Sequence, residues 1–223
     1  MRKNYIRVIL IMFIAGFFIA GCGGGTEISS EDQEGLDQAS EVDEQQDPAQ
    51  EEDEEDEFEA LLREIAEQQE EEDLFDAIMD DDLEALESLV QDGADVNVTG
   101  IVGVTPMHVA ARNNRYEMAE KLLELGSDLN LLTDGGHTSL HSAAHGDSPE
   151  IAQLLIDHGI DIDVQDNHGA TALHRAAIEG HIATAEVLLA NGIDDSIQQD
   201  NGRTALDIAE QNDDQDMMEL LSD

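Results

Sequence analysis

Apolar and small residues recur at a fixed interval of 33 residues from about position 73 to the end of this chain. Polar and turn-forming residues lie between them and keep the same interval. The clearest series are a leucine at Leu122, Leu155, Leu188 and Leu221, an alanine at Ala110, Ala143, Ala176 and Ala209, and a threonine at Thr105, Thr138, Thr171 and Thr204. A fixed period of this length predicts a stack of one small unit, in which each unit buries its apolar face against its neighbours.

The sequence of each unit predicts two short helices and a projecting hairpin. Thr105 followed by Pro106 combines an N-cap hydroxyl with a proline at the first helical position, and Ser148 with Pro149 repeats this pair at a second helix. Glycine just past the second helix, as at Gly126, predicts the helix end. The turn between the two helices falls on residue types that tolerate a left-handed backbone, at Asp81, Asn114, Asp147, Gly180 and Asp213.

The amino-acid sequence of the unit resembles the ankyrin repeat. Residues 105–111 read Thr-Pro-Met-His-Val-Ala-Ala, residues 138–144 and 171–177 follow the same pattern, and residues 93–97 read Gly-Ala-Asp-Val-Asn. The resemblance implies an all-α solenoid over residues 73–223, built of helix pairs with projecting β-hairpin loops, with about five repeats of which the first and last are atypical. It also implies a module that binds proteins through its hairpin tips and the groove beside its first helices.

The first 21 residues resemble the signal peptide of a bacterial lipoprotein. Basic residues precede the apolar run 8–20, which is too short for a membrane span of roughly 20 residues, and Ile19-Ala20-Gly21 leads to Cys22, the only cysteine in the chain. The resemblance implies lipid attachment at Cys22 and anchoring in the bacterial cell envelope. Gly23 favours the outer membrane where there are two membranes. An ordinary secretory signal is the alternative.

Residues 22–57 predict a disordered acidic tether, because they are poor in apolar residues and include the acidic run 51–57. Next, Phe58, Leu61, Leu62 and Ile65 fall at helical spacing and form an amphipathic stripe. The preferred interpretation of residues 58–72 is a helix that caps the first repeat. The alternative is a separate helix that binds a partner.

The charge is strongly negative: 54 Asp and Glu against nine Lys and Arg give a net charge of −45. Nucleic acid and anionic lipid headgroups are therefore poor partners, whereas a basic protein partner is well matched. Solubility or a saline habitat explains the same acidity, and the sequence leaves these interpretations open.

No catalytic constellation, metal site, cofactor or small-molecule substrate is predicted. His137, His141 and His145 are spaced by four, as on a metal-binding helix face, but His137 precedes the helix and His141 occupies the structural histidine position of the repeat. Residues 161–166 lack the central glycine and distal glutamate of a calcium-binding loop.

The candidate partner-binding residues are those that differ between repeats, since the recurring residues hold the stack together. Two neighbouring hairpins carry apolar residues, which either form an exposed patch or pack on one another, and the groove side carries a mixed set. The hairpin candidates are Val98, Ile101, Val102, Leu131 and Leu132, and the groove candidates are Arg112, Ser142, His145, Arg175 and Ile178.

The sequence thus predicts a lipid-anchored envelope protein that binds another protein. One specific form is an inhibitor or immunity protein for an envelope-acting toxin or enzyme. The alternative is a general periplasmic scaffold or protective partner of an envelope enzyme, and an envelope hydrolase is the least favoured interpretation.

Overall fold

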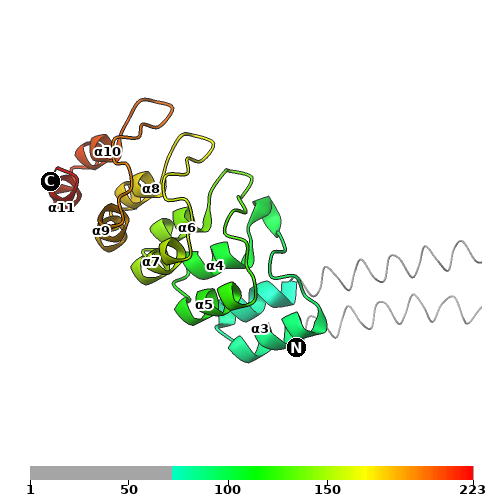
Figure 1. Cartoon of the computed structure of the whole chain (residues 1–223). Coiled ribbons are helices and arrows are strands. Elements are labelled where there is room, and N and C mark those ends of the chain that lie inside the picture. The colour runs from blue at the N-terminus through cyan, green and yellow to red at the C-terminus, as the bar shows by residue number, and fades with distance from the viewer. Residues whose placement is uncertain (1–71, 223) are drawn as a thin grey trace, which may run out of the picture. The chain divides into compact units, whose positions relative to one another are not determined.

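The computed structural model describes residues 72–222 (Figure 1). The predicted signal peptide with Cys22, the tether, and the segment 58–72 up to residue 71 lie outside the described residues.

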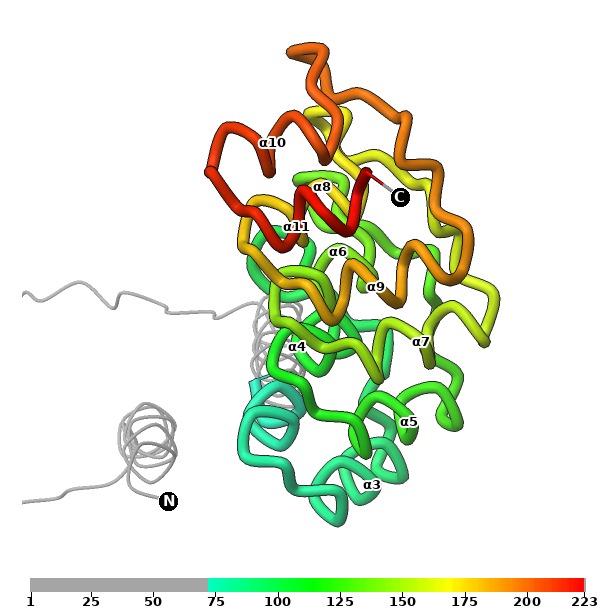
Figure 2. Tube along the Cα trace, turned by 90° about the vertical axis from the view of Figure 1, so that its left-hand side faces the viewer, coloured from blue at the N-terminus to red at the C-terminus, as the bar shows by residue number. Residues whose placement is uncertain are grey.

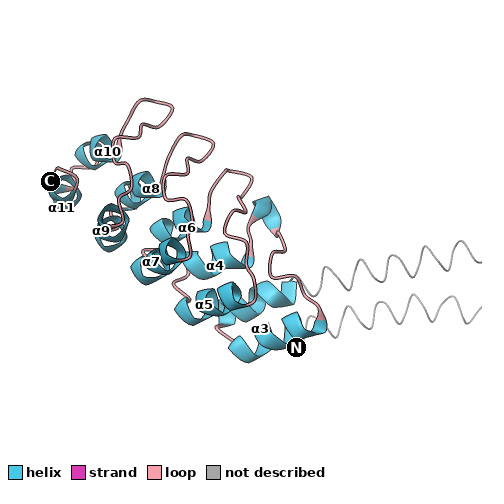
Figure 3. Cartoon of the chain, in the orientation of Figure 1, coloured by secondary structure: helices cyan, strands magenta, loops and turns pink. Residues whose placement is uncertain are grey.

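Within residues 72–222 the helices follow one another in pairs, which confirms the predicted helix-pair solenoid (Figure 3). Helical residues 72–80 pair with α3. The labelled helices are α3 (Leu83–Asp92), α4 (Pro106–Arg112), α5 (Tyr116–Glu124), α6 (Ser139–His145), α7 (Pro149–Asp157), α8 (Ala172–Glu179), α9 (Ile182–Ala190), α10 (Ala205–Gln211) and α11 (Gln215–Leu220), with a short 3-10 turn, η1 (Ile101–Gly103), between α3 and α4.

The pairs stack in chain order and form two layers. The first helices of successive pairs, α4, α6, α8 and α10, pack on one another, and α5, α7, α9 and α11 form the second layer (Figures 1 and 2). The connecting loops project on the side of the first helices. We call these loops the first to fourth fingers, residues 98–104, 131–137, 164–170 and 197–203.

The turns inside the helix pairs are left-handed where the sequence predicted them. The φ angles of Asp81, Asn114, Asp147, Gly180 and Asp213 lie between 49° and 75°. Thr105, Thr138, Thr171 and Thr204 are the N-cap residues of the first helices, also as predicted. Ser148 lies at the N-cap of α7, but its hydroxyl makes no cap hydrogen bond and donates to the carbonyl of Gly146 instead.

The core is aliphatic and continuous through the stack. Leu122, Leu155 and Leu188 of the second helices are fully buried, as are the recurring alanines of the first helices. The small side chains let neighbouring first helices approach closely. Gly146, the C-cap residue of α6, lies so near α4 that a Cβ atom there would be 2.0 Å from the carbonyl oxygen of Arg112.

Each finger is closed by a backbone hydrogen bond between its first and last tip residues, and a second one runs from the glycine N–H before the last residue to the carbonyl of the first. The closing pairs, from N–H to C=O, are Gly100 to Val104, Thr133 to His137, Asp166 to Ala170 and Gln199 to Arg203, at 2.8 to 3.0 Å. One backbone hydrogen bond of 3.0 Å joins each of the first three fingers to the next. These isolated bonds do not build a ladder, so the loops are hairpin-like but no β-strand occurs among residues 72–222.

Candidate protein-binding surface

Three buried histidines tie each full repeat to the finger of the next one. In α6, His141 Nδ1 lies 3.2 Å from the backbone nitrogen of Thr138 and 2.8 Å from its hydroxyl, while Nε2 lies 3.0 Å from the carbonyl oxygen of Ala170. His108 and His174 make the same contacts one repeat earlier and later, reaching the carbonyls of His137 and Arg203.

This geometry requires neutral histidines. A carbonyl oxygen only accepts, so Nε2 carries the proton, and Nδ1 accepts from the threonine N–H and hydroxyl. Burial lowers the pKa of His141 to about 4 and also lowers the pKa of His108 and His174, against the opposing effect of the carbonyl bonds. His141 therefore has both ring nitrogens engaged within the stack.

The last repeat departs from this pattern where no further finger follows. Asp207 replaces histidine, and its carboxylate accepts from the backbone N–H of Thr204 at 2.8 Å and from its hydroxyl at 2.9 Å. Aspartate thus reproduces the cap but carries no donor for a next finger. In the first repeat Phe75 stands at this position and packs beside Gly100, where a Cβ atom would lie 3.1 Å from its ring.

A polar cluster that does not repeat lies at the base of the second and third fingers. His137 Nε2 lies 3.1 Å from Asp166 Oδ2 and 3.2 Å from Arg175 Nη2. Arg175 Nη2 is 3.8 Å from the same carboxylate oxygen, and the Asp166 side chain is only 2% exposed. The cluster therefore joins two fingers and α8 on the groove side of the middle repeats.

The pKa shifts of the cluster follow from burial and from its charges. Burial lowers the pKa of His137, and the nearby Arg175 guanidinium lowers it further, against the opposing effect of Asp166. Burial alone would raise the pKa of Asp166, but backbone N–H groups of Ala170 and His168 outweigh it, so the pKa is lowered. Asp166 is consequently an ionised, buried carboxylate that anchors the third finger.

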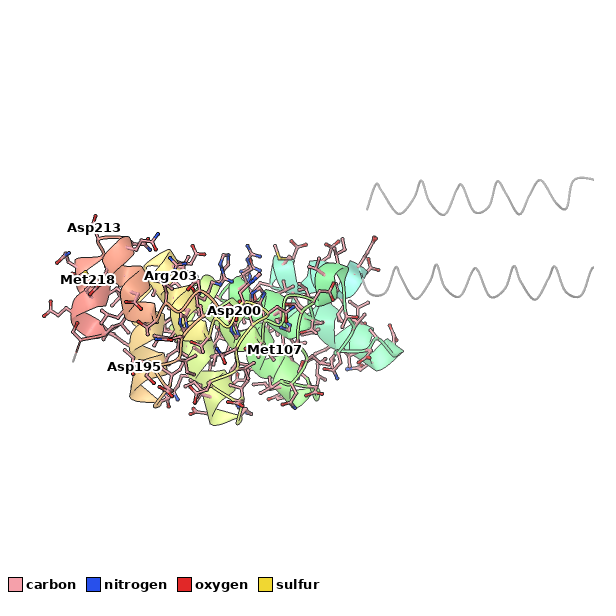
Figure 4. The ribbon with its side chains drawn as sticks, turned by 90° about the horizontal axis from the view of Figure 1, so that it is seen from above. Met107, Asp195, Asp200, Arg203, Asp213 and Met218 are labelled. Carbon is pink, nitrogen blue, oxygen red and sulfur yellow. The ribbon has the colours of Figure 1, made fainter. Side chains whose placement is uncertain are left out.

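The other groove candidates form a mixed surface beside this cluster. Arg112 and Ile178 are exposed, and Ser142 is half-buried. His145 Nδ1 lies 3.1 Å from Glu179 Oε1, which links α6 to α8. The structure thus brings Arg175 and the predicted groove residues to one side of α4, α6 and α8. Figure 4 looks onto the fingers from above, with Asp200 and Arg203 of the fourth finger labelled.

The apolar hairpin candidates divide into two groups. Ile101 is 89% exposed, Val102 60% and Leu132 48%, whereas Val98 and Leu131 are partly buried. We call Ile101, Val102 and Leu132 the apolar tip residues. The first two fingers are in direct contact, since the N–H of Asp134 donates to the carbonyl of Val102 at 3.0 Å. Val98 thus packs against the buried core, and the apolar tip residues remain exposed.

Val102 combines exposure with a strained backbone. Its φ of 57° and ψ of 30° lie in the left-handed region, which is unfavourable for a β-branched residue. The corresponding positions of the later fingers are Gly135, His168 and Asn201, and none of them has positive φ. Val102 therefore departs from the corresponding residues of the later fingers in its backbone conformation.

Three residues of the surface were missed in the sequence: His137 as a groove residue, Asp166 and Glu179. A signal was present, since the positions equivalent to His137 are Val104, Ala170 and Arg203, and those equivalent to Asp166 include Thr133 and Gln199. Departure from the repeat could have identified them.

Two further features are absent from residues 72–222. No group of three His, Cys, Asp or Glu side chains in this part is placed to hold a metal ion. None of its helices combines the length and apolar character that crossing a membrane requires.

Comparison with known families gives one result. A family model described as ankyrin repeats (3 copies) matches residues 55–133, 74–166, 107–198 and 162–223. No curated protein matches the chain.

Proposed function

Because the chain belongs to the ankyrin-repeat family, we propose that it binds another protein through its apolar tip residues and the adjoining groove. Repeats of this family suggest protein–protein interaction, and the chain departs from its own repeat at these positions. The observation that carries the choice of site is the first finger, where Ile101 and the strained Val102 are exposed instead of the polar residues of the later fingers.

The test of this site compares a triple variant of the apolar tip residues with a double variant of the later fingers, which serves as the control. Replacing Ile101, Val102 and Leu132 by Asn removes the apolar tips, whereas His168→Ser with Gln198→Ser changes exposed residues of the third and fourth fingers. In a pull-down from an envelope extract with the whole chain as bait, the first variant should lose the captured partner and the second should retain it. Equal capture by both would place the interface elsewhere.

The partner's charge can be tested separately. The chain has a net charge of −45, so a basic partner held mainly by this field should lose affinity steeply between low and moderate salt. A partner held by the apolar tips should bind nearly as well at 0.5 M salt as at about 0.1 M. Measuring the captured partner's affinity at both salt concentrations distinguishes the two modes.

We further propose that the protein is anchored by lipid on Cys22 in a bacterial envelope, where it inhibits or neutralises a toxin or enzyme. The supporting features are the lipobox-like sequence 19–22, the absence of a second thiol in the chain, and an acidic surface that suits a basic target. Cys22→Ala should abolish membrane pelleting while leaving the solenoid folded. Continued pelleting of this variant would exclude the anchor.

The inhibitory role has its own experiment. The purified chain should suppress the activity of the captured partner in a dose-dependent way, and the Ile101, Val102 and Leu132 triple variant should not. A partner whose activity is unchanged or protected by the chain would support a scaffold or protective role instead.

A further inference from the structure

Resting on the binding site proposed above, we infer that the partner contributes a carboxylate to Arg112, in addition to the apolar side chains that cover the tip residues. Arg112 is the last residue of α4 and lies on the groove side. The surface concerned consists of the first two fingers and the first helices that follow them, residues 98–112 and 131–145. We call these residues the acid-poor face.

The acid-poor face interrupts an otherwise acidic chain. Asp134 is its only acidic residue, and Arg112 is its only lysine or arginine. The turns and second helices that alternate with it, residues 113–130 and 146–163, hold nine Asp and Glu against two Lys and Arg. The negative charge of these two repeats is therefore carried by the second-helix layer and its turns, while the fingers and first helices are nearly neutral.

Arg112 is the basic residue whose charge stays unpaired within residues 72–222. Its side chain is exposed and makes neither an ion pair nor a hydrogen bond in this part of the chain. Covering it with a partner that supplies no counter-charge would leave an uncompensated guanidinium in the interface, which is strongly unfavourable. The other Lys and Arg residues of this part are engaged: Arg115 with Asp81, Lys121 with Glu87 and Glu124, Arg175 with Asp166 and His137, and Arg203 with Gln211.

A carboxylate of a protein segment is the group that matches this site. One guanidinium binds one carboxylate through two parallel hydrogen bonds. Nucleic acids and lipid surfaces present phosphates in rows, which need several cations and are repelled by the net charge of −45. The overall charge of the partner is a separate property, because the acidic second-helix layer can still steer a basic protein toward the chain.

The geometry also sets a minimum spacing within the partner. The first finger leads directly into α4, and Arg112 ends that seven-residue helix (Figure 1). Such a helix rises about 10 Å, and an extended peptide spans about 3.3 Å per residue. In a segment that lies along α4, the carboxylate should therefore be at least about three residues away from the apolar side chain that contacts Ile101 or Val102.

Selection from a random peptide library on the whole chain supplies defined probes. At about 0.15 M salt, the enriched peptides should carry Leu, Ile or Phe at this spacing from Asp or Glu. They should not bind the triple variant of Ile101, Val102 and Leu132. No enrichment, or binding that ignores the triple variant, would overturn the proposed site together with its partner chemistry. Enriched peptides that need the tips but carry Lys or Arg, or no charge, would overturn only the carboxylate contact.

A double-mutant cycle with one enriched peptide tests the contact itself. Replacing the peptide's Glu by Gln should weaken binding to the unaltered chain about fivefold, but binding to Arg112→Ala less than about twofold, because that variant has no guanidinium to lose. An equal loss in both chains would overturn the contact, even if the tips remain essential.

Charge reversal separates this contact from the general field of the molecule. Arg112→Glu should weaken binding of the same peptide about tenfold or more. Arg203→Glu in the fourth finger changes the net charge equally, and only the backbone carbonyl of Arg203 is needed by His174, so this control should leave the affinity nearly unchanged. Equal losses in the two variants would show that the peptide responds to overall charge and not to Arg112.

Discussion

At the residue scale, the histidine bridges make folding sensitive to mild acid. The pKa of His141 is about 4 in the folded protein, against about 6.5 in an unfolded chain, so the unfolded state binds more protons between these values. The free energy of unfolding should therefore fall as pH drops below about 6.5. We expect a loss of up to about 2 kcal/mol from His141 between pH 7 and pH 5, measured by urea unfolding. His108 and His174 act in the same direction.

The control for this prediction is His141→Gln. Glutamine does not titrate, so this variant should be less stable than the unaltered chain at pH 7 but should lose less stability on going to pH 5. Keeping the measurement at pH 5 or above limits the contribution of carboxylates. A pH profile as steep as that of the unaltered chain would show that His141 is not a source of the sensitivity.

Replacing Val102 should increase the stability of the fold and weaken binding of the partner. Asn tolerates the left-handed conformation, whereas valine at φ 57° is strained by roughly 1 to 2 kcal/mol. Val102→Asn should therefore raise the free energy of unfolding by about 1 kcal/mol and weaken partner capture. Val98→Ala, which trims a partly buried residue of the same finger, should lower stability instead. A destabilised Val102→Asn would argue against the strain.

Single residues were predictable where a local rule decides their conformation. The threonine N-caps and the five left-handed turn positions follow from residue type and immediate neighbours. Neither the strain at Val102 nor the half-buried state of Leu131 could be predicted, because both depend on how one finger lies against the next.

At the element scale, the fingers owe their close contact to glycine. Gly136 and Gly202 have similar φ angles of 77° and 82°. A Cβ at Gly136 would lie 2.7 Å from Asn167 Oδ1, but at Gly202, where no finger follows, nothing lies within 4 Å. Gly136→Ala should thus cost about 1 to 3 kcal/mol more than Gly202→Ala in thermal or urea unfolding, since only the first adds a clash to the backbone strain. Equal losses would mean that the fingers do not press on one another.

The elements also show the limits of a sequence pattern. The period and the helix signals predicted the helix pairs, and the structure confirms them. The β-hairpin character implied by the resemblance is limited to the backbone hydrogen bonds at the tip of each finger, which do not continue into a ladder of paired strands. Ser148 carries the residue type of an N-cap, but its hydroxyl turns to Gly146, a choice that local sequence does not determine.

At the scale of the whole molecule, the repeat predicted the architecture, but not the contacts that cross repeats. His137, Asp166 and Arg175 come together although 29 residues separate His137 from Asp166 and 38 separate it from Arg175. Only the stacking of one unit on the next creates such a cluster. Stacking also determines where the charges lie. The net charge of the whole chain is negative, but the groove brings the basic residues Arg112 and Arg175 to one side.

A linear stack should lose stability according to the number of neighbours that a residue has. Leu155 is fully buried in α7, between α5 and α9, whereas Leu221 follows α11 at the end and is 9% exposed. Leu155→Ala should cost about 2 to 5 kcal/mol, and Leu221→Ala about half of that or less, in urea unfolding. Leu188→Ala, which also has repeats on both sides, serves as the control and should resemble Leu155→Ala. Equal costs at all three positions would contradict nearest-neighbour coupling and would point to one global core.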